Sequence, residues 1–115
     1  MVKMTQFLTR RSDLTREQFS EHWEKKHWPI ILSIPEAKKF TKRYVQQHNI
    51  GQVPQGITAA PYDGIAEAWF ETIDDLYKLV GTQAWRTIVV KDEENFLDRS
   101  KMILMFSEEK VDFKG

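Results

Sequence analysis

A histidine in line with an apolar helix face has the clearest chemical potential in this sequence. Phe19, Trp23 and His27 fall at i, i+4 and i+8, so a helix would place them on one face. An imidazole among hydrophobic groups can transfer protons near neutral pH. The other interpretation is a histidine that closes the helix end onto a backbone carbonyl. On the first interpretation, Trp23 and Trp28 shape the surroundings of the imidazole.

A second pair of polar rings lies on one expected strand, residues 39–48. Tyr44 and His48 share a strand face with Phe40, because alternate residues point the same way. A phenol and an imidazole on one pocket wall could orient a carbonyl or phenolic oxygen during catalysis. The alternative is a surface histidine and a core tyrosine whose hydroxyl is hydrogen bonded.

A carboxylate, Glu67, lies in the apolar segment 65–70, which reads as a buried strand. A buried carboxylate needs a partner or a raised pKa. Arg43 or Arg86 is the expected partner if the role is structural. If Glu67 contacts a substrate, it supplies a second acid/base group or orients a histidine.

Aromatic residues suited to a hydrophobic ligand pocket are spread over the whole chain. The alternative is that they form the core and a subunit interface. The expected pocket residues are Phe7, Trp23, Trp28, Trp69, Trp85 and Phe96.

Metal and cofactor sites are not indicated. His22 and His27 lie about 140° apart around an α-helix, so they would not share a metal, and His22 is expected to face solvent. The chain has no cysteine, no HExxH pattern, no glycine-rich phosphate loop and no nucleophile elbow. We therefore expect neither a metal nor a bound cofactor.

Composition disfavours other classes of partner. The 17 basic and 17 acidic residues cancel, whereas a nucleic-acid-binding protein normally has a basic excess. No apolar run approaches the length of a membrane span, and no signal peptide opens the sequence. We expect one cytoplasmic domain spanning residues 1–115.

Hydrophobic periodicity and turn residues predict the elements that would position these side chains. Strands are expected at 2–9, 39–48, 65–70 and 102–106, and helices at 15–27 and 72–81, with a further helical turn within 83–90 and an acidic turn at 92–98. Thr15 and Gln18 fit a capping box. Pro29 is expected to end or kink the first helix, and Pro29 and Pro35 bound its end. The long loop 49–63 is either a binding loop or a passive insertion.

The order β-α-β-β-α-β predicts an α+β, ferredoxin-like fold, in which a four-stranded antiparallel sheet carries both helices on one face. Segments 65–70 and 102–106 are apolar on both faces, although a sheet face in water should be polar. We therefore expect a homodimer in which two sheets pack against each other.

Several sequence blocks together carry a family resemblance: 19–23, His27-Trp28-Pro29, 44–48, 63–70 and 92–98. In content and order they resemble the EthD-like family of the dimeric α+β barrel superfamily. The resemblance extends over about Val2 to Ser107 and is weakest in loop 49–63. It implies the dimeric barrel fold and a pocket between sheet and helices.

The resemblance also implies a range of activities. Relatives include lactone isomerases, decarboxylases or dehydratases of aromatic polyketides, and proteins linked to ether-degrading monooxygenases. Our first hypothesis is a cofactor-independent enzyme acting on a hydrophobic aromatic, polyketide or lactone-like molecule, with catalysis by His27, Tyr44 and His48. The alternatives are a non-catalytic binding or accessory protein and a cofactor-free monooxygenase. Fold analogy alone does not choose among them.

Overall fold

Four strands form one antiparallel sheet in the computed structural model, which describes all residues from 1 to 115. The strands are β1 (Val2–Leu8), β2 (Arg43–His48), β3 (Gly64–Phe70) and β4 (Ile103–Ser107). They lie in the order β2-β3-β1-β4, and every neighbouring pair is antiparallel. This topology is the ferredoxin-like fold predicted from the sequence.

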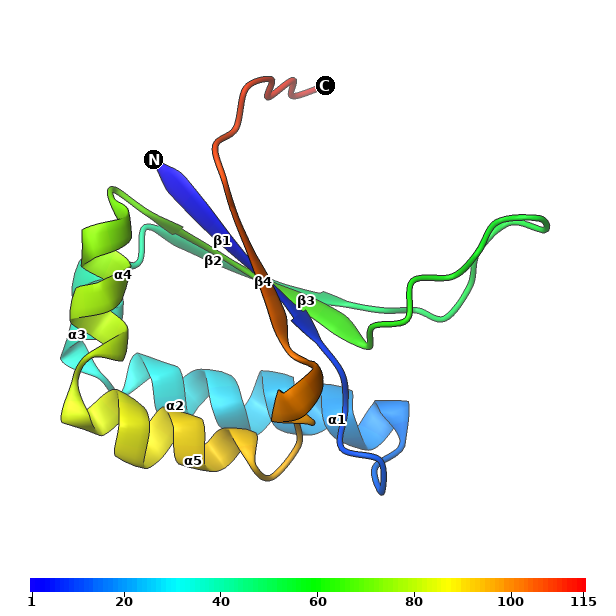
Figure 1. Cartoon of the computed structure of the whole chain (residues 1–115), viewed down its shortest axis with the longest axis horizontal. Coiled ribbons are helices and arrows are strands. Elements are labelled where there is room, and N and C mark those ends of the chain that lie inside the picture. Colours follow the sequence, from blue (N-terminus) through cyan, green and yellow to red (C-terminus); the bar gives the residue numbers. More distant parts are fainter.

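The helices gather on one side of this sheet, as Figure 1 shows. The helical elements are α1 (Arg16–His22), a π-helical turn (Trp23–His27), α2 (Trp28–Leu32), α3 (Pro35–Phe40), α4 (Ile73–Val80), a second π-helical turn (Trp85–Val89), α5 (Val90–Glu93) and a 3-10 turn (Arg99–Lys101). No helix covers the opposite side of the sheet, and we call it the bare face. It carries Lys3, Thr5, Phe7, Ile65, Glu67, Trp69 and Met105. No helix combines the length and apolar composition needed to cross a membrane.

The first helix begins as predicted but continues beyond His27. The Thr15 hydroxyl accepts a hydrogen bond from the Gln18 N–H, and the Gln18 side chain accepts one from the Thr15 N–H, which confirms the capping box. The chain then stays helical through Pro29 to Leu32, so the end predicted near His27 was wrong, although the helix does end between Pro29 and Pro35. A proline in an α-helix crowds the carbonyl four residues earlier. Here that carbonyl lies in the π-helical turn, which is wider than an α-helical turn.

The second strand is shorter than predicted. Residues 35–40 form helix α3, with Pro35 in its first turn, where a missing N–H costs nothing. The strand begins only at Arg43, so Phe40 does not share its face with Tyr44 and His48 as predicted.

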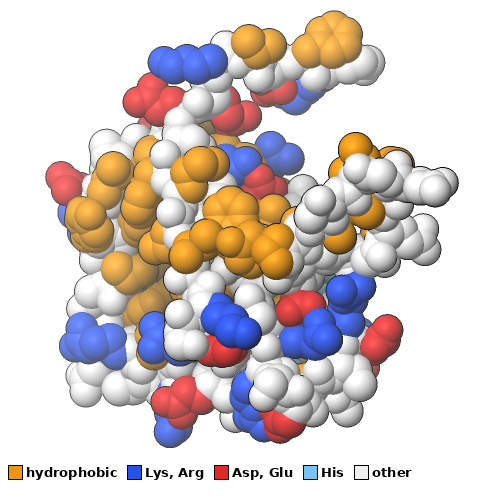
Figure 2. Space-filling view, turned by 45° about the vertical axis from the view of Figure 1, so that its right-hand side comes forward, with side chains coloured by type: hydrophobic (Ala, Val, Ile, Leu, Met, Phe, Trp, Pro, Cys, Tyr) orange, Lys and Arg blue, Asp and Glu red, His pale blue; other side chains and the backbone are white.

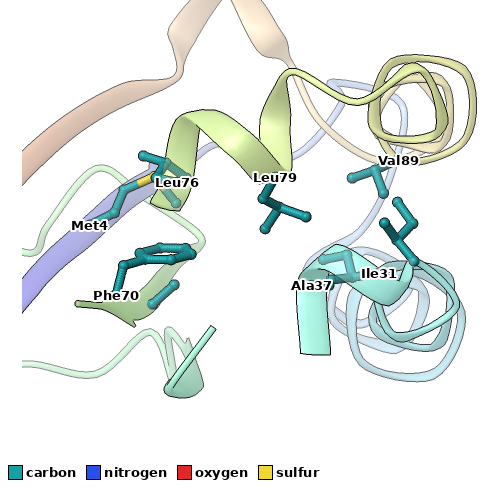
Figure 3. Packing of buried hydrophobic residues seen from close by; sticks show 9 residues of the cluster. Met4, Ile31, Ala37, Phe70, Leu76, Leu79 and Val89 are labelled. Atoms are coloured by element: carbon teal, nitrogen blue, oxygen red, sulfur yellow. The ribbon is translucent and has the colours of Figure 1, made fainter. Parts of the chain in front are cut away.

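The main hydrophobic core lies between the sheet and the helices. Figure 3 shows Met4 and Phe70 from the sheet near Leu76 of α4, whereas Leu79 points toward Ala37 and the other helices. A second core cluster, built around Phe19, Trp23 and Phe96, lies beneath α1 and its π-helical turn. These two clusters fix the elements that carry His27.

Strand β4 leaves much apolar surface uncovered. Ile103, Leu104 and Met105 are each about half exposed, and Phe106 is 40% exposed. Figure 2 shows hydrophobic side chains gathered in the middle of one face of the molecule. A water-facing strand normally alternates polar and apolar residues, so this surface has the character of an interface.

Candidate active site

A single buried carboxylate joins two histidines. Nδ1 of His27 lies 2.7 Å from Oδ2 of Asp92, and Nε2 of His22 lies 3.0 Å from both oxygens of the same carboxylate. The Asn95 side-chain amide donates to Oδ1 at 3.1 Å. His27 and Asp92 are both buried, so this is a polar cluster inside the protein.

The π-helical turn explains how His22 and His27 reach the same partner. In an α-helix, residues five apart lie about 140° from each other. Within Trp23–His27, the Trp28 N–H instead bonds the Trp23 carbonyl five residues earlier, which changes the helical phase. The prediction that His22 faces solvent was therefore wrong. Such turns occur often at functional sites.

Electrostatics keep the imidazole of His27 neutral and the carboxylate of Asp92 charged. Burial lowers the pKa of His27, and the hydrogen bond and charge of Asp92 oppose this only in part. Burial acts to raise the pKa of Asp92, but hydrogen bonds from His27, Asn95 and His22 outweigh it and hold that pKa below its ordinary value. An ionised carboxylate only accepts, so Nδ1 carries the proton and Nε2 carries the lone pair.

His27 lines a cavity between the sheet and the helices. The cavity has a volume of about 50 Å³, and most of its lining is hydrophobic, including Trp23, Trp28, Trp85 and Phe96. Nε2 of His27 makes no hydrogen bond within the chain. The volume suffices for a few water molecules, so a larger ligand requires the surrounding side chains to move.

Tyr44 presents a neutral phenol to the same cavity. Burial raises its pKa to about 12. Its ring stacks in parallel on Trp28, with 4.2 Å between centroids, and its oxygen accepts a hydrogen bond from the Gln46 amide at 3.1 Å. The hydroxyl proton thus remains available for a ligand oxygen.

His48 does not line this cavity. Its ring packs against Trp23 at 4.4 Å between centroids and borders a separate groove beside loop 49–63. Nε2 of His48 is bonded to Oε1 of Gln46, so a side-chain amide links it to Tyr44. Trp23 also packs on Gly64, where a Cβ atom would lie 2.5 Å from the indole ring. Trp23 therefore keeps its place only because residue 64 lacks a side chain.

The structure places three further predicted residues away from His27. Phe7, Glu67 and Trp69 alternate with cavity-facing and core residues along β1 and β3, so they point to the bare face. Glu67 pairs with Lys3 and accepts a hydrogen bond from Gln47, rather than pairing with Arg43 or Arg86 as predicted.

The charged side chains on the bare face have partners on that face, either an opposite charge or an aromatic ring. Burial acts to raise the pKa of Glu67, but Lys3 and Gln47 outweigh it and hold the pKa below its ordinary value. The Arg43 guanidinium instead lies over the Trp69 ring, 4.6 Å from its centroid.

Sequence reasoning missed Asp92 and Glu93. Both belong to α5, where an acidic turn was predicted. Glu93 is buried, lines the cavity with His27, and pairs through Oε1 with Nε of Arg99 at 3.0 Å. The available signal was helical spacing, because Val89, Glu93 and Phe96 lie in line at i, i+4 and i+7.

Comparison with known proteins agrees with this architecture. The model of the EthD domain matches residues 11–100. No curated protein matches the chain. An EthD-family protein from Bacillus halodurans superposes with a TM-score of 0.69 at 20% identity, covering 95% of this chain and 98% of that one.

Two other structures share the fold at lower identity. A dimeric protein of ferredoxin-like fold from Bacteroides fragilis has a TM-score of 0.64 at 14% identity, covering 94% of this chain and 95% of that one. A candidate antibiotic biosynthesis monooxygenase from Nitrosomonas europaea has a TM-score of 0.63 at 12% identity, covering 96% of this chain and 100% of that one. At these identities the likeness is one of fold.

Proposed function

The chain belongs to the EthD domain family, and from that premise we propose that it is a cofactor-independent enzyme that moves a proton on a hydrophobic, oxygenated molecule. The observation that carries the proposal is the 2.7 Å bond between Asp92 and His27, which leaves Nε2 unbonded at an apolar cavity. A neutral imidazole oriented by a carboxylate is a general base.

The mechanism follows from the two polar groups at the cavity. Nε2 of His27 removes a proton from a carbon next to a carbonyl, and the C–H electrons move toward the carbonyl oxygen. The Tyr44 hydroxyl donates a hydrogen bond to that oxygen as negative charge develops on it. The carboxylate of Asp92 stabilises the imidazolium that forms. A positioned base of this kind contributes a factor of about 10²–10⁴.

The substrate class follows from the lining. Hydrophobic side chains dominate the cavity, and the parallel Trp28–Tyr44 stack supplies a flat wall. A planar aromatic, polyketide or lactone-like carbonyl compound matches both features, and it would enter the cavity only as the surrounding side chains move. Isomerisation, dehydration and cyclisation of such compounds begin with the step described. Decarboxylation reaches the same type of enolate by breaking a C–C bond and releasing CO₂, and His27 would then return a proton to carbon.

Proton NMR in D₂O tests this function. The protein is mixed with a panel of enol lactones, β-keto aromatic acids and polyphenols, and loss of carbon-bound protons is followed. We expect accelerated exchange that His27→Ala abolishes and His22→Gln largely retains, since only His27 lines the cavity. Circular dichroism checks that both variants fold.

Two other results would replace the proposal. Line broadening without exchange, in the wild type and in His27→Ala alike, indicates a binding or accessory protein. Oxygen consumption with an electron-rich phenol indicates a cofactor-free monooxygenase instead.

We also propose that the protein is a homodimer formed through the bare face and β4. Met105 is half exposed and pairs with Thr5 on that face, so a second copy would bury it. Sedimentation measurements should give a dimer for the wild type and a monomer for Met105→Glu. Ile88→Glu is the matched control, because Ile88 is also exposed, at 44%, but lies on a helical turn. Equal masses for both variants would contradict the proposed interface.

A further inference from the structure

A buried carboxyl group that the proposed mechanism does not use lines the same cavity as His27. Glu93 is the last residue of α5 and only 6% exposed. The neighbouring residue Asp92 is hydrogen bonded to Nδ1 of His27 and does not line the cavity, whereas Glu93 lines it. Helix α5 therefore places the Asp92 carboxylate against the imidazole and the Glu93 carboxyl group at the cavity.

The contacts of Glu93 leave one oxygen available. Oε1 pairs with Nε of Arg99, which lies on the 3-10 turn, and Oε2 has no ion-pair partner. Such a one-sided contact holds the carboxyl group in place without occupying both oxygens. The titratable and charged groups around it are Arg99, Asp92 on its own helix, and His27 and Tyr44 at the same cavity.

The surroundings also favour the protonated form of Glu93. Burial raises its pKa to about 7, Arg99 opposes the shift, and the negative charge of Asp92 adds to it. The pKa of His27, in contrast, is lowered by burial. Two groups at one cavity whose surroundings push their pKa values in opposite directions form an acid and base pair.

We propose that Glu93 is a second catalytic residue, which gives a proton to one end of a conjugated carbonyl substrate while His27 removes a proton from the other end. This inference rests on the proposed function, and it assigns the reaction class as a proton shift between two atoms. It goes beyond simple exchange at one carbon, for which His27 alone would suffice.

The proton shift balances within the site. Nε2 of His27 takes a proton from carbon, and the C–H electrons form a new double bond. The existing double bond shifts, and its electrons form a new C–H bond with the proton from Glu93. The imidazolium then releases a proton to water, and the Glu93 carboxylate takes one up, so no net proton is consumed.

The test compares Glu93→Gln with the wild type and His27→Ala. Conversion of an enol lactone and exchange of its carbon-bound proton in D₂O are measured separately. We expect Glu93→Gln to retain exchange but to lose conversion by a factor of about 10²–10⁴. The alkaline fall of kcat/KM, which reports loss of the Glu93 proton, should disappear in this variant. In Arg99→Gln it should move upward by about one pH unit, because a cation beside Glu93 is removed.

The outcomes separate the two proposals. If His27→Ala abolishes exchange while Glu93→Gln converts substrate at the wild-type rate, the role of Glu93 is overturned and the proposed function stands. If the wild type shows neither exchange nor conversion, the proposed function is contradicted, and the role of Glu93 that rests on it is contradicted too. Infrared titration of the carboxyl stretch, assigned by its loss in Glu93→Gln, needs no substrate. A carboxyl group that titrates at the ordinary glutamate pKa would overturn the inference by itself.

Discussion

Replacing Asp92 by asparagine removes the negative charge that is hydrogen bonded to Nδ1 of His27 and keeps the size of the side chain. The 2.7 Å bond from Nδ1 to Oδ2 becomes an ion pair when Nε2 takes up a proton. A hydrogen bond between charged groups contributes about 1.5–3 kcal/mol, compared with about 1 kcal/mol between neutral groups. Losing this difference raises the barrier by about 0.5–2 kcal/mol. That corresponds to a proton-exchange rate about 2–30-fold lower.

Exchange of a carbon-bound proton in D₂O measures this rate directly, and a thermal melt shows that the variant is folded. His22→Gln is the matched control, because His22 bonds the same carboxylate without lining the cavity. We expect its rate to stay close to that of the wild type. The reasoning is refuted if folded Asp92→Asn exchanges protons as fast as the wild type, or if His22→Gln is equally impaired.

Three further predictions concern stability and use urea denaturation. The folded state holds the Glu93 proton more tightly, with a pKa of about 7 against 4.5 in the reference state, so wild-type stability falls relative to Glu93→Gln as pH rises through 7, by about 3 kcal/mol between pH 4.5 and 8. Gly64→Ala should cost about 1–3 kcal/mol, because its Cβ would overlap Trp23. Phe96→Ala should cost about 3–5 kcal/mol, because the ring is fully buried between Phe19 and His27. A pH-independent difference between the wild type and Glu93→Gln would contradict the first prediction. Unchanged midpoints for Gly64→Ala and Phe96→Ala would contradict the packing described.

Much of the fold could be predicted because strands and helix caps depend on residues close together in the sequence. Alternation identified the strands, and the Thr15 capping box marked the start of the first helix. The errors lay where tertiary packing overrides local preference. Pro29 lies inside a continuous helix because a π-helical turn precedes it, and residues 35–40 form a helix instead of extending β2.

The candidate site could be predicted only in part. His27 was identifiable because an apolar stripe runs through it, and Tyr44 because of strand alternation; the structure brings both to one cavity. His48 shares the strand face of Tyr44, but the indole of Trp23 packs against it, and it borders a different groove. Alternation specifies a face, and it does not specify what covers that face.

The sequence by itself determined the element order, the topology and the residue most suited to proton transfer, because periodicity and residue chemistry are local properties. The tertiary structure alone decided the partners of that residue. Asp92 is 65 positions from His27 in the chain, and their contact depends on the phase of a π-helical turn and on the packing of α5 beside it. Burial then lowers the pKa of His27 and raises that of Glu93, whereas hydrogen bonds keep Asp92 ionised. Burial and these contacts are properties of the assembled fold.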